Sequence, residues 1–283
     1  MIRFDDVRMA WRSRVILDQV SGTLRDGRVT ALVGRNGAGK SSLLGVLHGD
    51  RPNNLASGTV THDDRALTSM RRHDLALWRA VLPQHASLSF PLTVEDVVAL
   101  GRAPHALRAR GLSASQEREL VLDALARVGL CGRELERYDV LSGGERQRVH
   151  LARTLAQLAP LDESLRGKWL FLDEPTASQD MAHAHHMLEL VRDLAGRFGL
   201  GVCVVLHDLN LVMRYTHDVI VLEKGRIVAA GETSQVIDED LLARVFRVRA
   251  RRIDGVFDDT PDLCVGGYCK QPGVGDDREE VWQ

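Results

Sequence analysis

The chain has 283 residues, a formal net charge of −2 and 44 % hydrophobic residues, enough for one large or two small domains with a sizeable core. The near-neutral charge supplies no basic surplus for phosphate contacts, so we expect no nucleic-acid partner. No apolar run of about 18 residues occurs, and the charged start MIRFDDVRMAW does not resemble a signal peptide. We therefore expect a cytoplasmic protein that does not span a membrane.

The first third of the chain predicts strands and one abrupt change from strand to helix. Residues 2–11 alternate in polarity and VILDQVSGTL (15–24) follows, so we expect two antiparallel strands closed by an Asp26-Gly27 turn. VTALV (29–33) is a short apolar strand that runs into the glycine-rich GRNGAGKS (34–41) and then a helix. Further strands are predicted over 58–64 and 80–83.

A helical block from about 85 to 160 interrupts the run of strands. Thr93 with Asp96, and Ser113 with Gln116, have the spacing of helix N-terminal capping pairs, and Gly129 is placed to end a helix. The next strand, KWLFLDE, comes only at 168–174. We interpret the block as a helical subdomain inserted into a nucleotide-binding core.

After residue 180 helix and strand alternate, which indicates a mostly parallel sheet covered by helices. The predicted elements are a helix over 181–198, a strand over 200–207 and a hairpin over 219–232 that turns at Lys224-Gly225. LARVFRVRARRIDGVFDD (242–259) adds a helix and a strand. Residues 246–283 form a C-terminal extension, and its end, from about 258, lacks a period and is expected to be partly disordered.

The segment GRNGAGKS matches the phosphate-loop pattern G-x-x-x-x-G-K-[ST]. Glycines let successive backbone N–H groups point at one centre, and the helix that starts near Lys40 adds its dipole to this anion site. Lys40 can reach the β- and γ-phosphates, and the Ser41 hydroxyl can bind Mg²⁺. The predicted nucleotide-binding residues of this loop are Gly34, Arg35, Asn36, Gly37, Ala38, Gly39, Lys40, Ser41 and Ser42.

Three other predicted strands end in polar side chains. In WLFLDE, Asp173 is placed to hold Mg²⁺ through water, and Glu174 is placed as the general base for an attacking water. Gln84 and His207 also end strands, and ligands bind at the carboxyl ends of the strands of a parallel sheet. Taken alone, each of these residues is more often structural, but together with a phosphate loop they indicate catalysis.

A second glycine turn, LSGGERQ, opens another predicted helix at 141–147. Ser142 and Glu145 have the spacing of a capping box, which leaves free N–H groups and a positive dipole end for a phosphate. The alternative is that Ser142 only caps its own helix. Gly143 and Gly144 argue against this, because each weakens a helix start by about 1 kcal/mol relative to Ala and is better explained by close approach of a ligand.

In this order the motifs resemble the nucleotide-binding subunit of an ATP-binding cassette (ABC) transporter over residues 1–245. The resemblance implies an α/β fold with a P-loop NTPase core and mostly parallel sheet, an N-terminal antiparallel β subdomain and the inserted helical subdomain. It also implies that ATP and Mg²⁺ bind, with Mg²⁺ held by Ser41, Gln84 and Asp173, and that His207 contacts the γ-phosphate.

The resemblance also implies that two copies of the chain form a dimer that shares two ATP sites. The resemblance places Ser142, Gly143 and Gly144 on the γ-phosphate of ATP held by the other copy, and Asp180 in the loop where the copies touch. Trp11 would stack on adenine, by its position only. Gln84 would report the state of the nucleotide to a membrane partner.

LGRAPH (100–105) and AHAHHML (182–188) resemble bacterial importers of metal chelates, and most of all haem (hemin) importer ATPases. The implied partners are two permease subunits and, indirectly, a periplasmic haem-binding protein, with this chain peripheral on the cytoplasmic side of the inner membrane. Import of a ferric siderophore or of cobalamin is the open alternative. A more distant one is a soluble ABC ATPase in DNA repair or translation, although no sustained heptads of the kind found in the coiled coils of such proteins occur.

Overall fold

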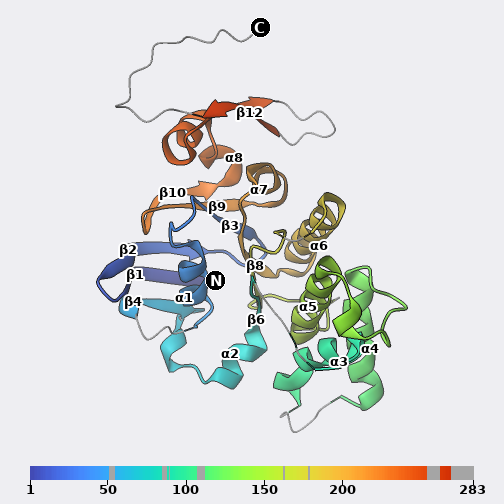
Figure 1. Ribbon diagram of the computed structural model, residues 1–283. Helices are drawn as coiled ribbons and strands as arrows, with labels where there is room; N and C mark the ends of the chain where they lie inside the picture. The colour runs from blue at the N-terminus through green and yellow to red at the C-terminus, as the bar shows by residue number, and fades with distance from the viewer. Residues whose placement is uncertain are drawn as a thin grey trace.

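The computed structural model describes residues 1–50, 55–84, 88, 90–106, 112–161, 163–177, 179–253 and 262–268. In these residues a six-stranded sheet has the order β10-β9-β3-β8-β7-β6, a four-stranded sheet the order β2-β1-β4-β5, and β11 pairs with β12. In Figure 1 the N-terminal strands and the helices α3, α4 and α5 lie on opposite sides of the six-stranded sheet.

The N-terminal sheet is antiparallel, as expected. Its strands are β1 (Ile2–Trp11), β2 (Arg14–Leu24), β4 (Leu55–His62) and β5 (Arg65–Ala66). The hairpin between β1 and β2 turns at Arg12-Ser13, where Arg12 has a φ of 54°. The prediction that Asp26-Gly27 closes this hairpin is wrong, because that turn leads from β2 into the six-stranded sheet. An Asp-Gly pair marks a change of direction without saying which strands it joins.

The six-stranded sheet is parallel except for one edge. β3 (Val29–Val33) runs parallel to β8 (Gly201–Val205) and β9 (Asp218–Glu223), and β7 (Trp169–Asp173) runs parallel to β8 and β6 (Arg79–Leu82). β10 (Arg226–Glu232) pairs antiparallel with β9 through the expected Lys224-Gly225 turn. The mostly parallel sheet is thus confirmed, and the carboxyl ends of β3, β6, β7 and β8 meet at one edge.

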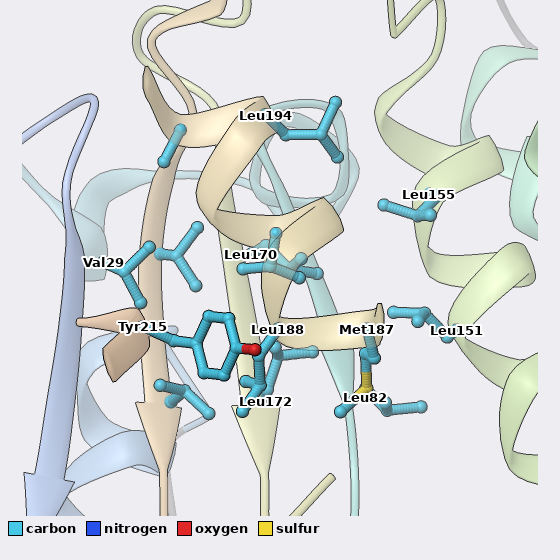
Figure 2. Close-up of a cluster of buried hydrophobic side chains, with 14 of the residues drawn as sticks. Val29, Leu82, Leu151, Leu155, Leu170, Leu172, Met187, Leu188, Leu194 and Tyr215 are labelled. Atoms are coloured by element: carbon cyan, nitrogen blue, oxygen red, sulfur yellow. The ribbon is translucent and has the colours of Figure 1, made fainter. Parts of the chain in front are cut away.

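Both faces of this sheet are covered, so its strands are apolar at successive positions and supply two separate cores. Trp169 and Phe171 of β7 pack with the N-terminal sheet and α1, whereas Leu170 and Leu172 pack on the opposite face. Figure 2 shows the second core, in which leucines of β7 meet side chains of α5 and α6. The labelled partners from these two helices are Leu151, Leu155, Met187, Leu188 and Leu194.

The inserted block lies between β6 and β7 and holds α3 (Val94–Ala99), α4 (Ala114–Arg127) and α5 (Gly143–Leu158). All three helices begin with complete capping boxes, formed by Thr93 with Asp96, Ser113 with Gln116, and Ser142 with Glu145. Short 3-10 turns occur at Leu67–Ser69, Leu100–His105 and Tyr138–Val140. The remaining helices before β7 are α1 (Lys40–Leu47) and α2 (Arg72–Trp78).

The last part of the chain continues the alternation with α6 (Met181–Phe198), α7 (Leu209–Tyr215), α8 (Thr233–Val236) and α9 (Glu239–Leu241). A π-helical turn at Leu242–Phe246 leads into β11 (Val248–Ile253) and β12 (Asp262–Tyr268). β12 forms in the stretch that showed no sequence period, and the rest of the tail lies outside the described residues. Within the described part of the chain, no helix has both the length and the apolar character needed to cross a bilayer.

The imidazole of His48 at the end of α1 lies in an apolar setting that penalises its charge. Its ring meets the Phe171 ring edge-on at a centroid distance of 5.6 Å, and its Nδ1 has no hydrogen-bond partner among the described residues. Burial, helped by repulsion from Arg79, lowers the pKa of His48 from its ordinary 6.5 to about 4. The folded state therefore binds this proton less readily than the unfolded chain does.

We predict that lowering the pH from 7 to 4 costs about 2 to 3 kcal/mol of unfolding free energy through this one imidazole. The loss begins near pH 6.5, where the unfolded chain takes up the proton. Denaturant unfolding as a function of pH should show this component in the wild type and lose it in His48→Gln. His186→Gln, which removes an exposed imidazole, should keep the wild-type profile. Parallel profiles for the wild type and His48→Gln would contradict the prediction.

Candidate functional site

The phosphate loop follows β3 directly and turns into α1 at Lys40. Gly34 has a φ of 147°, and a Cβ there would lie 2.2 Å from the Leu222 carbonyl oxygen. Gly39 caps α1 with a φ of 103°, and its Cβ would come within 3.0 Å of Ile16 and Leu17. Both positions therefore require glycine, because the loop is packed tightly between β2 and β9. This packing fixes the backbone that opens the helix.

Lys40 curls back over the loop that precedes it. Its side chain is buried, and Nζ donates to the carbonyl oxygens of Gly34 at 2.9 Å and Arg35 at 3.3 Å. Burial lowers the pKa of Lys40, while the nearby charges of Glu174 and Asp173 oppose that shift. The ammonium is thus held at the loop in a place where an additional negative charge would stabilise it.

Ser41 and Asp173 meet across the carboxyl edge of the sheet. The Ser41 hydroxyl donates to Asp173 Oδ1 at 3.0 Å, although 132 residues separate the two in the chain. Burial raises the pKa of Asp173, with a further contribution from Glu174, and the Ser41 bond acts in the opposite direction. The hydroxyl oxygen of Ser41 and the carboxylate oxygen of Asp173 thus lie side by side, one from the start of α1 and one from the end of β7.

Glu174 is held from two sides by the other strand-end residues that the sequence singled out. Gln84 Nε2 donates to Glu174 Oε2 at 2.6 Å, and His207 Nε2 lies 2.6 Å from Glu174 Oε1. Glu174 itself has a φ of 49°, in the left-handed region. Gln147 of α5 donates to the carbonyl oxygen of the next residue, Pro175, at 2.5 Å. The predicted catalytic residues therefore gather around one carboxylate, and α5 supports the loop that carries it.

A cleft of about 940 Å³ opens over the phosphate loop. Trp11, which is 56 % exposed, lines it together with loop residues 35–42. Sequence reasoning missed several cations here. Arg14 comes from β2, Lys224 from the β9–β10 turn and Arg247 from the start of the C-terminal extension. No local motif marks them, because only the folded chain brings these segments together.

The second glycine turn has the predicted form at the start of α5. Glu145 Oε2 accepts from the Ser142 backbone N–H at 2.8 Å, and the Ser142 hydroxyl caps the Glu145 N–H in return. An ion pair with Arg133 and the bonds to Ser142 lower the pKa of Glu145 to about 2. Ser142 and Gly143 are exposed, and neither they nor Gly144 are among the described residues that line the cleft over the phosphate loop.

Asp180 and the three histidines that follow it belong to α6. Asp180 caps the helix by accepting from the His183 N–H at 2.9 Å, and it also contacts His183 Nδ1 at 2.7 Å. His185 Nδ1 lies 2.7 Å from the Tyr215 hydroxyl, whereas His186 Nε2 lies 3.3 Å from the Arg127 carbonyl oxygen. The three imidazoles thus have separate partners. Across the described ranges, no three His, Cys, Asp or Glu side chains are grouped as metal ligands.

The ABC transporter family profile matches residues 17–177, which is more than half of the chain. Three relatives share the name hemin import ATP-binding protein HmuV. The protein from Agrobacterium fabrum is 42 % identical over 88 % of this chain and 92 % of its own. The Burkholderia thailandensis protein is 41 % identical over 92 % and 98 %. The Streptomyces coelicolor protein is 47 % identical over 85 % and 81 %.

Solved structures agree in fold. One, described as a metal-chelate type ABC transporter in an inward-facing conformation, superposes with a TM-score of 0.75 at 23 % identity, over 93 % of this chain and 96 % of that one. A dimeric bacterial ABC transporter cassette gives 0.71 at 24 % identity, over 82 % and 99 %. The family match and the relatives that are 41 to 47 % identical over most of both chains show that this protein belongs to the ABC transporter family, as one of its ATP-hydrolysing members.

Proposed function

We propose that this protein is the ATP-hydrolysing subunit of an importer that takes up haem through a separate membrane permease. The observation that carries the chemistry is the carboxylate of Glu174, held by Gln84 and His207 beside the Ser41–Asp173 pair. The haem cargo is supported by the relatives named hemin import ATP-binding proteins, which are 41 to 47 % identical to this chain.

ATP would lie in the cleft over the phosphate loop, with adenine against Trp11. The backbone N–H groups of residues 34–42 and the Lys40 ammonium would bind its phosphates, and the dipole of α1 adds to their attraction. Burial already makes the charge of Lys40 costly, so a phosphate beside it offsets that cost. The exposed face of Trp11 suits stacking on a base, because an aromatic ring buries a large area without needing a fixed hydrogen bond.

The residues present fit Mg²⁺. The Ser41 hydroxyl and the Asp173 carboxylate are oxygen donors that already meet at 3.0 Å, and hard cations such as Mg²⁺ take oxygen ligands. Gln84 donates to Glu174 through its amide nitrogen, so its amide oxygen would be a third ligand for Mg²⁺. When bound, Mg²⁺ neutralises charge on the β- and γ-phosphate oxygens.

Glu174 would take the proton of the attacking water, as the general base. Its carboxylate follows the end of β7 directly and is held by Gln84 and His207, which come just after two other strands, so the sheet helps to fix its position. His207, next to it, would contact the γ-phosphate. Gln84 links the base to the inserted helical block and would report the state of the nucleotide to the permease.

A second copy of the chain would complete each ATP site. At the N-terminus of α5, Ser142 and Gly143 are exposed, and neither they nor Gly144 are among the described residues that line the cleft of their own chain, which suits a γ-phosphate held by another copy. Asp180, exposed at the start of α6, would lie where the copies touch. Closure of the pair on ATP and reopening after hydrolysis would then shift the permease between two states.

The remaining assignments follow from this role. Residues 1–245 would form the ATPase domain, with the helical subdomain at about 85–160 docking on two permease subunits, and residues 246–283 an extension. The protein would be peripheral on the cytoplasmic side of the bacterial inner membrane. A periplasmic haem-binding protein would act on it indirectly, through the permease.

We predict that Glu174→Gln still binds ATP and dimerises but hydrolyses it at least 100-fold more slowly, because an amide cannot take the proton from water. Phosphate release gives the rate, and light scattering with and without ATP gives the dimer. Glu189→Gln, the same change at an exposed position of α6, should hydrolyse ATP at the wild-type rate. Wild-type turnover in Glu174→Gln would remove Glu174 from the role of base.

The shared site predicts complementation between two inactive variants. Ser142→Arg blocks the glycine turn and Lys40→Ala disables the phosphate loop, so each alone should be inactive. A mixed dimer keeps one site built from two intact halves, and random pairing should restore roughly a quarter of the wild-type ATPase rate. A mixture that stays inactive, or full activity in Ser142→Arg alone, would contradict sharing between copies.

The cargo can be tested with the complete transporter in lipid vesicles. ATP hydrolysis should rise when the periplasmic binding protein is added in its haem-loaded form and not when it is added empty. Binding proteins loaded with a ferric siderophore or with cobalamin, each tested with the same ATPase and permease, serve as comparators. Stimulation by one of these and not by haem would overturn the haem assignment while leaving the ATPase role intact.

A further inference from the structure

Arg247 is a cation of the nucleotide cleft that comes from outside the segment matched by the family profile. It lines the cleft together with Trp11, the phosphate loop and the Lys224-Gly225 turn. It lies 70 residues beyond the end of the matched segment, residues 17–177. None of the motifs of the ATPase includes it.

The backbone around Arg247 is anchored on both sides. Before it, the π-helical turn buries Leu242 and Val245 completely in the core of the ATPase. After it, β11 pairs with β12, whose Leu263 is buried. The Leu263 N–H donates to Asn210 Oδ1 at 2.7 Å, and Asn210 Nδ2 donates back to the Leu263 carbonyl at 3.4 Å. The hairpin is thus tied to α7, and Arg247 is held at the cleft by packed structure.

Arg247 also has an unusual backbone for its residue type. Its φ is 61°, in the left-handed region that non-glycine residues adopt at a cost and that is concentrated at functional sites. Glycine would take this conformation without strain. The chain therefore keeps an arginine where the backbone favours glycine, which points to a use for the side chain.

The charges around Arg247 suit a polyanion. Glu223 is the single acid among the described residues that line the cleft, against the cations Arg14, Arg35, Lys40, Lys224 and Arg247. In the described part of the chain no carboxylate pairs with the Arg247 guanidinium, in contrast to Arg28, which is bonded to Asp218 at 2.7 and 2.9 Å. A guanidinium that lacks a carboxylate partner presents two parallel donors, the geometry that binds phosphate oxygens.

We propose that Arg247 binds the phosphates of the nucleotide, so that the C-terminal extension supplies part of the ATP site. The inference rests on the proposed function, in which ATP occupies this cleft. It adds a binding residue that no motif contains, and it gives the β11–β12 hairpin a task, namely to hold that residue in place.

The test uses the full-length chain in EDTA, where hydrolysis does not interfere, and measures equilibrium binding by calorimetry. The probes are ATP, inorganic tripolyphosphate and adenosine. Arg247→Gly removes the guanidinium and keeps the backbone conformation without strain. Arg247→Lys keeps the charge but loses the paired donors. Arg249→Ala removes an exposed cation of β11, two residues after Arg247, and is the matched control for net charge.

We expect Arg247→Gly to bind ATP and tripolyphosphate about tenfold more weakly and adenosine as well as the wild type does. Arg247→Lys should lie in between, and Arg249→Ala should match the wild type. Equal affinity of Arg247→Gly and the wild type for ATP, or an equal loss in Arg249→Ala, would overturn the inference alone. So would a loss confined to adenosine, which would place Arg247 at the base. A wild-type chain that binds ATP neither in EDTA nor in the presence of Mg²⁺ would overturn the proposed function as well.

Discussion

The shared carboxyl edge of β3, β6, β7 and β8 is the constraint on which the site depends. Parallel pairing in register fixes where each of these strands ends, so the residues that follow them arrive at one line along the sheet. Gln84, Glu174 and His207 are far apart in the chain and become neighbours for this reason, and Asp173 at the end of β7 meets Ser41 beside them. A shift of one strand by one residue would break the bonds around Glu174, because side chains alternate between the two faces of a sheet.

Burial at this edge acts against the charges that the site contains. It lowers the pKa of Lys40 and raises the pKa of Asp173, so both side chains have lost hydration that the neighbouring protein groups do not fully replace. The burial of these two charges therefore raises the free energy of the folded protein when no ligand is bound. A ligand that carries both negative phosphates and a divalent cation relieves it on both sides at once, which favours a metal-bound nucleotide over either part alone.

Local patterns predicted most of this site, and contacts between distant segments explain what they missed. GRNGAGKS, LSGGERQ and WLFLDE each encode their own turn, cap or strand end within a few residues, so their conformations could be read from the sequence. Arg247 and Lys224 line the cleft, and Gln147 bonds to Pro175, only because the fold brings distant segments together. No spacing in the sequence predicts these contacts. The Asp26-Gly27 turn was misplaced for a similar reason, since a turn motif does not name its partner strands. β12, in the stretch without a period, is defined by its pairing with β11, another contact between separate segments.

The hydrogen bond from Gln147 to the carbonyl oxygen of Pro175 connects α5 to the loop that carries Glu174. The N-cap of this helix, Ser142, is exposed, and its flank, little more than one turn later, supports the peptide beside Glu174. A molecule that bound at Ser142 and tilted α5 would therefore also shift the peptide beside Glu174 of the same chain. In a symmetric dimer with this contact, the geometry at Glu174 of each copy would depend on the position of the other copy, so a change at one site would also change the other.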